Sequence, residues 1–400
     1  MVTTSGSGGN LGGVQARLWL ALGVVFAASA TAQAVVSCRA CSNRGNVVCN
    51  RHGKLLAREQ VEAGTLFCSV AADCRVCAGA LASDCKACAN TPAEDELRRR
   101  QELVREWLKK RRAAVDEVVE NKGLLHLETT HCDLVFSIRS ATVGKERLDT
   151  HALMHAYGDR IEALRALFRQ VLEVADEDLP ARMRVYMFRD AHDQGVIGPR
   201  ETGFGTTGSV GLKQMGPEFV YSMWQDPQSL ADDEALHRNV VHHVTHLLLS
   251  QMLPTQFLGN KGHGWIDEGL AHWFEDKVTG RCANFCFEEV LLHPGTGWKG
   301  GRWRAPVRRL VDDGKLPTFA ALSALNTDQL AFEDHAAAFA CVDFLLTVHG
   351  GARLRDLVRL VKRGQPTREA LQAVYGWNPI TFDAPFQKWV RETYAPTDPR

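Results

Sequence analysis

The chain has 400 residues, of which 45% are hydrophobic, so it is long enough to form more than one domain around a sizeable core. Lysine and arginine together number 47, as do aspartate and glutamate, and this balance gives no indication of a nucleic-acid partner. Eight of the 12 cysteines fall between Cys38 and Cys88, which confines a cysteine-dependent module to one part of the chain.

Residues 1–34 are predicted to be an export signal. An apolar run at 18–30 is too short to span a bilayer comfortably, and AQA at 32–34 matches a cleavage site. Two alternatives stay open: an uncleaved membrane anchor, and a lipoprotein, because VVSC ends at Cys38 like a lipobox. No later stretch is apolar enough to span a membrane. The mature protein is therefore expected to be secreted or extracytoplasmic (periplasmic or cell envelope), without a stable membrane span.

Residues 35–90 contain an internal repeat with metal-ligand spacing. The first copy has the pattern C-x2-C-x7-C-x2-H and the second has C-x2-C-x7-C-x2-C. Each copy supplies two chelating pairs of soft ligands, which suits a tetrahedral structural zinc ion. The predicted ligands are Cys38, Cys41, Cys49 and His52 in the first copy, and Cys74, Cys77, Cys85 and Cys88 in the second.

The first copy, CRACSNRGNVVCNRHG, resembles the cysteine-rich zinc repeats of J-domain-type chaperones. The resemblance implies a small zinc-knuckle fold holding one or two structural ions, and not chaperone activity. A disulfide framework is the alternative, since export permits disulfides. The repeated spacing and the histidine at position 52 favour zinc, and Cys68 belongs to neither copy.

Residues 91–123 are predicted to form a charged helix that links this module to the next domain. The sequence TPAE provides an N-cap threonine, a proline in the first turn and a glutamate in capping-box position. Acidic residues are interleaved with the basic clusters, which argues against a nucleic-acid-binding patch.

Residues 124–400 are predicted to form one domain with strands before helices. Alternating apolar residues predict strands at 129–139 and 182–188, and a helical apolar stripe predicts a helix at 151–175. The Gly-rich stretch 198–211, with 219–223, suggests an irregular hairpin or edge strand. Further helices are predicted at 239–253, 264–276, 318–325, 334–348, 353–362 and 368–375. The fold class is therefore α+β, with a mixed sheet followed by a helical C-terminal half.

The helix predicted at 239–253, NVVHHVTHLLLSQML, carries two histidines on one face. At about 100° per residue, His242 and His246 lie one turn apart, while valines and leucines cluster on the opposite side. The helix that follows offers Glu268. Two histidines and a carboxylate form a three-ligand zinc set that leaves the fourth position open.

This combination resembles the gluzincin metallopeptidases, the thermolysin-like or peptidase-MA-like group, whose zinc helix carries H-E-x-x-H and whose third ligand is a downstream glutamate. The resemblance covers roughly residues 125–395, and it implies one zinc ion at His242, His246 and Glu268. Where the family has its catalytic glutamate, the chain has His243, so the motif is H-H-x-x-H.

The resemblance also assigns residues around the ion. His272 stands where the family usually has an acidic residue that orients a zinc histidine, and Asp267 or Glu275 is expected to compensate. His335 stands where similar proteins often carry a tyrosine, so it is a candidate donor to the transition state. His243 is the candidate general base, although beside a cation it can instead become a further ligand.

Two functions follow, and the enzyme status stays open between them. The first is an exported zinc-binding protein of gluzincin fold that is catalytically impaired or silent and binds peptide or protein partners through the former active-site cleft. The alternative is an active zinc-dependent peptidase with a substituted general base. Cys282 and Cys286 are predicted either to bridge each other or to pair with Cys132 or Cys341.

Overall fold

The computed structural model describes residues 40, 46–51, 65–87, 106, 109–110, 123–205, 210–216, 218–253, 258–259, 262–286 and 301–397. The predicted export signal at 1–34 lies outside these residues. So do four of the predicted structural zinc ligands, Cys38, Cys41, His52 and Cys88. Of the predicted linker at 91–123, Glu106, Lys109 and Lys110 are described as helical.

The described strands form one large sheet and two small ones. Their bounds are β1 (Asn46–Val48), β2 (Phe67–Cys68), β3 (Ala82–Asp84), β4 (Leu125–Glu128), β5 (Cys132–Phe136), β6 (Ser140–Val143), β7 (Glu146–Asp149), β8 (Met183–Phe188), β9 (Gly211–Met215) and β10 (Phe219–Trp224). The large sheet has the order β2-β4-β5-β8-β10-β9. β5, β8 and β10 are parallel, while β2, β4 and β9 pair antiparallel with their neighbours. The predicted mixed sheet is confirmed.

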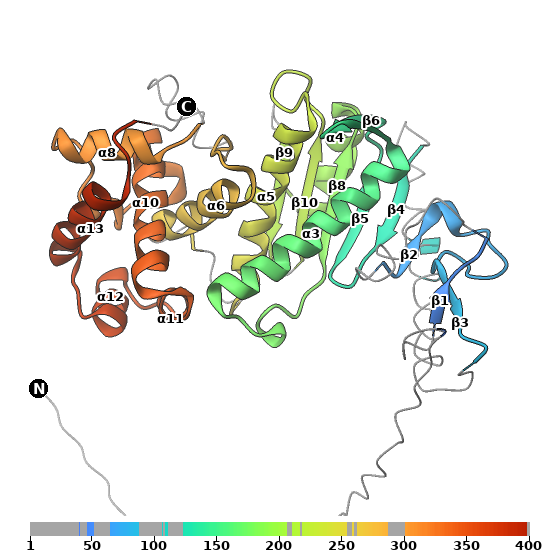
Figure 1. The fold of residues 1–400 in the computed structure, drawn as a ribbon, viewed down its shortest axis with the longest axis horizontal. Coiled ribbons are helices and arrows are strands. Elements are labelled where there is room, and N and C mark those ends of the chain that lie inside the picture. The colour runs from blue at the N-terminus through green and yellow to red at the C-terminus, as the bar shows by residue number, and fades with distance from the viewer. Residues whose placement is uncertain are drawn as a thin grey trace, which may run out of the picture.

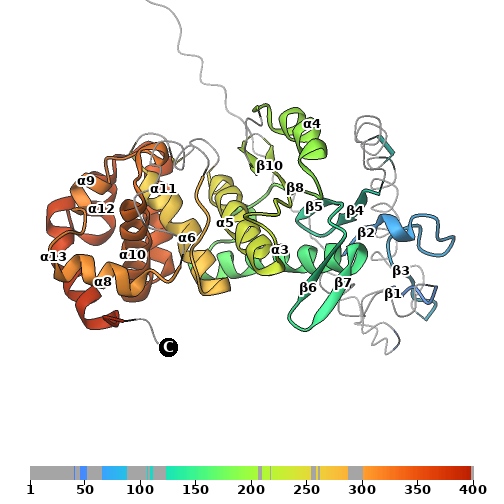
Figure 2. The ribbon, with the colours of Figure 1, turned by 90° about the horizontal axis from the view of Figure 1, so that it is seen from above.

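Two helices cross between the parallel strands and cover opposite faces of this sheet: α3 (Thr150–Leu172) and α4 (Ala191–Thr202) (Figure 2). Side chains alternate between the faces along each strand. Leu134 and Val185 belong to the main core with α3. Val135 and Tyr186 belong to a smaller core with Ile197 of α4. The strands are therefore buried on both sides, as a parallel sheet requires.

The prediction of an irregular hairpin at 198–211 is wrong at its start, because helix α4 extends to Thr202. Asp190 caps this helix by accepting a hydrogen bond from Asp193 N, and Gly203 ends it with a φ of 78°. Gly198 allows close packing, since a Cβ there would lie 3.2 Å from Leu212 of β9. Glycine and proline at 198–202 therefore belong to a tightly packed helix, and the predicted hairpin lies further along the chain, where β9 and β10 pair antiparallel. The predicted edge strand exists as β9.

The C-terminal half is helical: α5 and α6 lie next to the sheet, and the later helices pack beyond them, with α8 and α13 at the far end (Figure 1). Their bounds are α5 (Asp233–Gln251), α6 (Gly264–Thr279), α8 (Arg304–Asp312), α9 (Phe319–Leu322), α10 (Phe332–His349), α11 (Gly351–Lys362), α12 (Thr367–Tyr375) and α13 (Pro379–Thr393). Short 3-10 helices lie at Ser69–Ala71, Asp176–Asp178 and Thr327–Gln329. All six helices predicted after residue 238 are confirmed, whereas α8 and α13 were not predicted. None of the described helices is long and apolar enough to cross a membrane.

The described part of the cysteine-rich segment touches the large sheet directly. β1 and β3 form their own antiparallel pair. β2, however, pairs with β4, with Cys68 opposite Leu127. The segment before residue 90 therefore supplies the first strand of the sheet that the following domain builds.

Candidate metal centre

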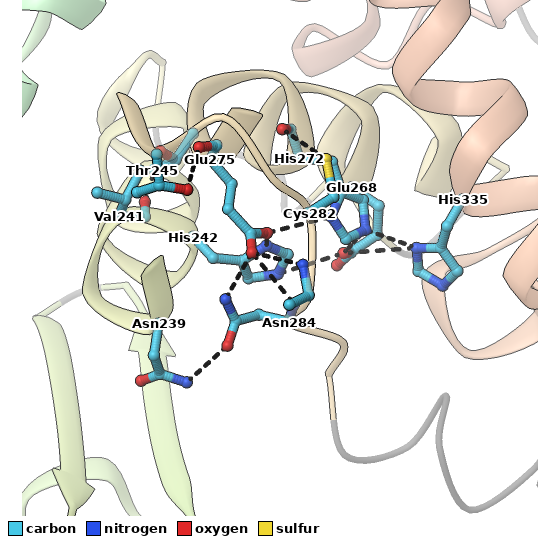
Figure 3. Close-up of polar contacts among 12 residues, drawn as sticks. Asn239, Val241, His242, Thr245, Glu268, His272, Glu275, Cys282, Asn284 and His335 are labelled. Atoms are coloured by element: carbon cyan, nitrogen blue, oxygen red, sulfur yellow. Dashed lines mark hydrogen bonds and ion pairs between the residues drawn. The ribbon is translucent and has the colours of Figure 1, made fainter. Parts of the chain in front are cut away.

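Three buried side chains from two neighbouring helices meet between the sheet and the helical half. Asp232 caps the start of α5 by accepting a hydrogen bond from Ala235 N, and the apolar back of this helix lies in the main core. Its front carries His242 and His246 toward Glu268 of α6, and all three side chains are 0% exposed. Figure 3 shows His242 and Glu268 converging from their two helices. The three residues predicted as ligands are thus neighbours in space.

The spacing of the ligand atoms suits one small cation. Nε2 of His242 lies 3.3 Å from Nε2 of His246. The two carboxylate oxygens of Glu268 lie 3.5 Å from Nε2 of His242 and 3.2 Å from Nε2 of His246. Two nitrogens bound to a tetrahedral zinc ion at about 2.0–2.1 Å are about 3.3–3.4 Å apart. The group therefore has the dimensions of a metal site.

Each histidine also has a carboxylate at its other nitrogen. Oε2 of Glu275 lies 3.2 Å from Nδ1 of His242 as a hydrogen bond, and Oδ1 of Asp267 lies 3.2 Å from Nδ1 of His246 as a close ion contact. A carboxylate at Nδ1 favours a proton there and leaves Nε2 as a lone-pair donor. Asp267 and Glu275 thus occupy the positions from which they can orient the histidines.

The facing nitrogens and carboxylate favour a positive charge between them. Burial lowers the pKa of His242, but Glu268 and Glu275 outweigh it and raise that pKa above its ordinary value. Burial raises the pKa of Glu268, but His246 and His242 outweigh it and hold that pKa well below its usual range. A divalent ion would supply this charge to all three ligands at once, so the residues fit a metal.

Cys286 completes the group at a fourth corner, and sequence reasoning did not assign it there. Its Sγ lies 3.4 Å from Oε1 of Glu268 and 4.0 Å from Nε2 of His246. The four ligand atoms lie within 4.8 Å of one another. Lys213 of β9 donates a hydrogen bond to the sulfur at 2.7 Å, and an ammonium in this position stabilises a thiolate. Nothing in the spacing from Glu268 could have indicated this ligand.

The chain segment before Cys286 is hydrogen-bonded to Glu275, the carboxylate behind His242. Oε1 of Glu275 accepts hydrogen bonds from Ala283 N at 2.6 Å and from Nδ2 of Asn284 at 2.7 Å. Asn239 of α5 donates to Asn284 from the other side, as Figure 3 shows. Glu275 therefore positions both His242 and the approach to Cys286.

His243, the candidate general base, lies beside the group but is not one of its members. Its ring stacks on Tyr221, with centroids 4.7 Å apart and planes at 30°. Burial and the charge of Lys213 lower the pKa of His243 well below its ordinary value. The imidazole is therefore neutral near pH 7 and gains a proton with difficulty.

His272 and His335 extend the group on the side away from the sheet. Nε2 of His272 lies 3.0 Å from Nδ1 of His335, and each histidine lies within 4 Å of Oε2 of Glu268. Nδ1 of His272 lies 3.4 Å from Oε2 of Glu275. Both histidines are 0% exposed. His272, predicted to stand behind the ligands, and His335, predicted to donate to the transition state, thus both lie next to Glu268, the third ligand. His335 is buried.

In the cysteine-rich segment, the described thiols gather across the two repeats. Pairing of β1 with β3 brings Cys49 of the first copy next to Leu81, so Cys49 lies 3.9 Å from Cys74 of the second copy. With Cys77, these sulfurs form a three-ligand group. Cys85 is not in that group. The choice between zinc and disulfides for the whole segment stays a prediction.

The prediction that Cys282 and Cys286 bridge each other, or pair with Cys132 or Cys341, is wrong for the described residues, because none of these four cysteines is in a disulfide bond. Among the described residues, no two cysteines are joined by a disulfide bond, and Cys282 donates to the carbonyl of His272. His263, just before α6, is not part of the metal group, and its ring hydrogen-bonds Thr367. It lines a cavity of about 810 Å³ between the loop before α6 and the start of α12.

Comparison with known proteins adds no assignment, since no family model matches the chain and no curated protein matches it. The likeness to gluzincins therefore stays a prediction from the motif residues. The described structure shows buried histidine, glutamate and cysteine groups that can hold a metal ion.

Proposed function

We propose that this protein is a catalytically silent, gluzincin-like protein that holds one zinc ion at a closed site and binds peptide or protein partners. The ligands are His242, His246, Glu268 and Cys286. The observation that carries the proposal is the sulfur of Cys286 at the fourth corner of the group.

The donor set favours zinc among the common divalent ions. Two imidazole nitrogens, one carboxylate and one thiol combine borderline and soft ligands, whereas magnesium and calcium prefer oxygen ligands only. The spacing of the nitrogens fits tetrahedral coordination. Burial of all four side chains supports a site that keeps its ion without exchange with solvent.

Two features of the site argue against hydrolysis. In a peptidase, zinc polarises the scissile carbonyl and activates a water at the open fourth position. In the proposed site Cys286 is the fourth ligand, which would leave no open position for this water. The residue expected as the base, His243, is a neutral ring stacked on Tyr221 with a lowered pKa. Loss of general-base catalysis alone typically costs a factor of about 10² to 10⁴ in rate.

The sheet edge next to the site supports the partner class. β9 is the last strand of the described sheet, and its Lys213 reaches Cys286. An exposed sheet edge can bind an extended peptide by adding it as a further strand. A peptide on β9 would therefore lie beside the metal group, as a substrate would in a peptidase. The predicted export signal makes the expected location extracytoplasmic.

The alternative function is an active zinc peptidase in which Cys286 leaves the ion. The carboxylates behind both histidines favour it, because they raise the basicity of the ligands as they do in working zinc enzymes. His335 also lies 3.8 Å from Glu268, within reach of the space around the ion.

The test compares bound zinc and peptide hydrolysis in the full chain and four variants. We expect His246→Ala to lose one equivalent of zinc relative to the wild type, and Cys286→Ala to bind this ion more weakly. Cys341→Ala, a buried cysteine on α10, serves as the matched control and should change neither quantity.

Activity separates the two functions. We expect no zinc-dependent hydrolysis by the wild type, and a gain of hydrolysis when Cys286→Ala is combined with His243→Glu. Hydrolysis by the wild type that His246→Ala abolishes would overturn the silent function and establish the alternative. An unchanged zinc content in His246→Ala would overturn the metal site itself.

A further inference from the structure

A second histidine pair lies at the start of α3, far from the centre described above. His151 and His155 are one helical turn apart, so their rings project from the same face of the helix. Their ring centroids are 4.9 Å apart with planes at 79°. The ligand pair on α5 has almost the same arrangement, with 4.9 Å and 73°.

A thiol faces this pair from the sheet. Cys68 ends β2, which lies beside β4, and its Sγ is 3.4 Å from Nε2 of His151. The sulfur and one nitrogen of each histidine lie within 4.8 Å of one another. In a tetrahedral zinc site, a sulfur and a nitrogen are about 3.6 Å apart, which follows from bond lengths of about 2.3 and 2.1 Å.

His155 is the observation that points to a ligand. It is 1% exposed, and neither of its ring nitrogens has a hydrogen-bond partner in the described structure. A buried polar group without a partner is costly to the fold, and native proteins rarely retain one without a reason. A metal ion bound to the nitrogen that faces Cys68 would remove that cost.

Cys68 would act as a thiolate ligand only with a cation bound beside it. Its side chain is buried, and the backbone N–H groups of Val70 and Ala71 donate to its sulfur. Burial raises the pKa of the free thiol to about 11, so a cation would be needed to hold the thiolate. His151 is half-buried.

We propose that Cys68, His151 and His155 form a second zinc site, which fastens strand β2 to helix α3. Three protein ligands leave the fourth position on the half-buried side. The site is independent of the four-ligand centre, and it uses the one cysteine of the N-terminal segment that belongs to neither repeat. Zinc then links the cysteine-rich segment to the main sheet beyond the short β2–β4 pairing.

The experiment measures zinc bound per chain after dialysis of the full-length protein against a weak chelator. We expect Cys68→Ser, His155→Ala and His151→Ala each to bind one equivalent less than the wild type. His151→Ala alters a half-buried position, so it is the variant that should fold most readily. His126→Ala, a histidine on β4 that is 2% exposed, is the matched control and should retain all the zinc.

Combination with the first site separates the two proposals. The double variant His151→Ala with His246→Ala should bind two equivalents of zinc less than the wild type. If the centre on α5 binds no zinc, His246→Ala alone will lose none, while His151→Ala will still lose one equivalent. Equal zinc in the wild type and all three variants would overturn the second site. A loss that His126→Ala reproduces would also overturn it, as would binding of Cu⁺ with no binding of Zn²⁺ in parallel titrations.

Discussion

At the scale of single residues, Glu275 has more contacts with the metal centre than its position in the sequence suggests. It is seven residues beyond Glu268, so α6 turns its side chain back toward α5 after almost two turns. One carboxylate oxygen holds His242 and the other holds the chain at residues 283–284. His242 and the approach to Cys286 therefore depend on one carboxylate.

Replacement of this carboxylate should weaken metal binding without removing a ligand. We expect Glu275→Gln to lower zinc affinity by a factor of about 10 to 100, the usual effect of losing an orienting partner. Competition with a chromogenic chelator measures the affinity. Asp276→Asn is the control, because Asp276 pairs with Arg304 at 2.7 Å on the neighbouring position of α6. Equal affinities in the two variants would contradict the role of Glu275.

At the scale of elements, the packing of α6 against α10 fixes where Glu268 stands. Gly269 follows Glu268, and a Cβ on it would lie 2.7 Å from the carbonyl oxygen of Ala338 and 2.9 Å from a methyl group of Val342. The two helices approach closely only because this position has no side chain. The third ligand is therefore placed by a backbone contact as much as by its own hydrogen bonds.

A methyl group at this contact should separate the helices. We expect Gly269→Ala to lower the free energy of unfolding by about 1–3 kcal/mol, as overpacking does in other cores, and to weaken zinc binding as well. Gly195→Ala in α4 is the matched control, because no atom lies within 4 Å of its Cβ. It should be neutral or stabilising by up to about 1 kcal/mol. Urea denaturation measures both, and equal stabilities would contradict the packing argument.

The sequence predicted the elements that have a periodic apolar pattern and missed the contacts that depend on tertiary packing. Periodic apolar patterns placed β5, β8, α3, α5 and α6, and with them the three ligands that one helix pair must bring together. Cys286 lies in a loop and Cys68 ends a very short strand, and each reaches its neighbours only through tertiary packing. Periodic patterns in the sequence carry no information about such contacts. Helix α4 was missed because glycine at position 198 serves close packing, which sequence cannot distinguish from a turn.

At the scale of the whole molecule, one buried lysine joins the helical half to the helix that carries the histidines. Lys362 of α11 is 1% exposed, and its Nζ donates to the carbonyl oxygens of Leu249 and Ser250, each at 2.8 Å. These carbonyls end α5, where a donor is most favourable. Burial lowers the pKa of Lys362 to about 7, although the negative charge of Asp267 acts to raise it.

This lysine should make stability depend on pH in the alkaline range. Its ordinary pKa is 10.5, so between about pH 7 and pH 10.5 the unfolded chain binds a proton that the folded chain has released. The free energy of unfolding should therefore rise with pH in that window, by up to about 1.4 kcal/mol per pH unit from this group.

Denaturation at pH 7 and pH 9 would measure the effect. Lys362→Met should abolish this part of the rise, whereas Lys315→Met, whose side chain is 70% exposed, should leave it intact. A rise of the same size in all three proteins would assign it to other groups.

The pairing of β2 with β4 has a consequence for where the chain can be shortened. A protein that began at residue 124, at the predicted domain boundary, would lack β2 and leave the backbone donors and acceptors of β4 unpaired at the rim of the sheet. Open strand edges of this kind associate with other chains and promote aggregation. Solubility of the part of the chain after residue 123 therefore depends on a strand that lies more than 50 residues before β4 in the sequence.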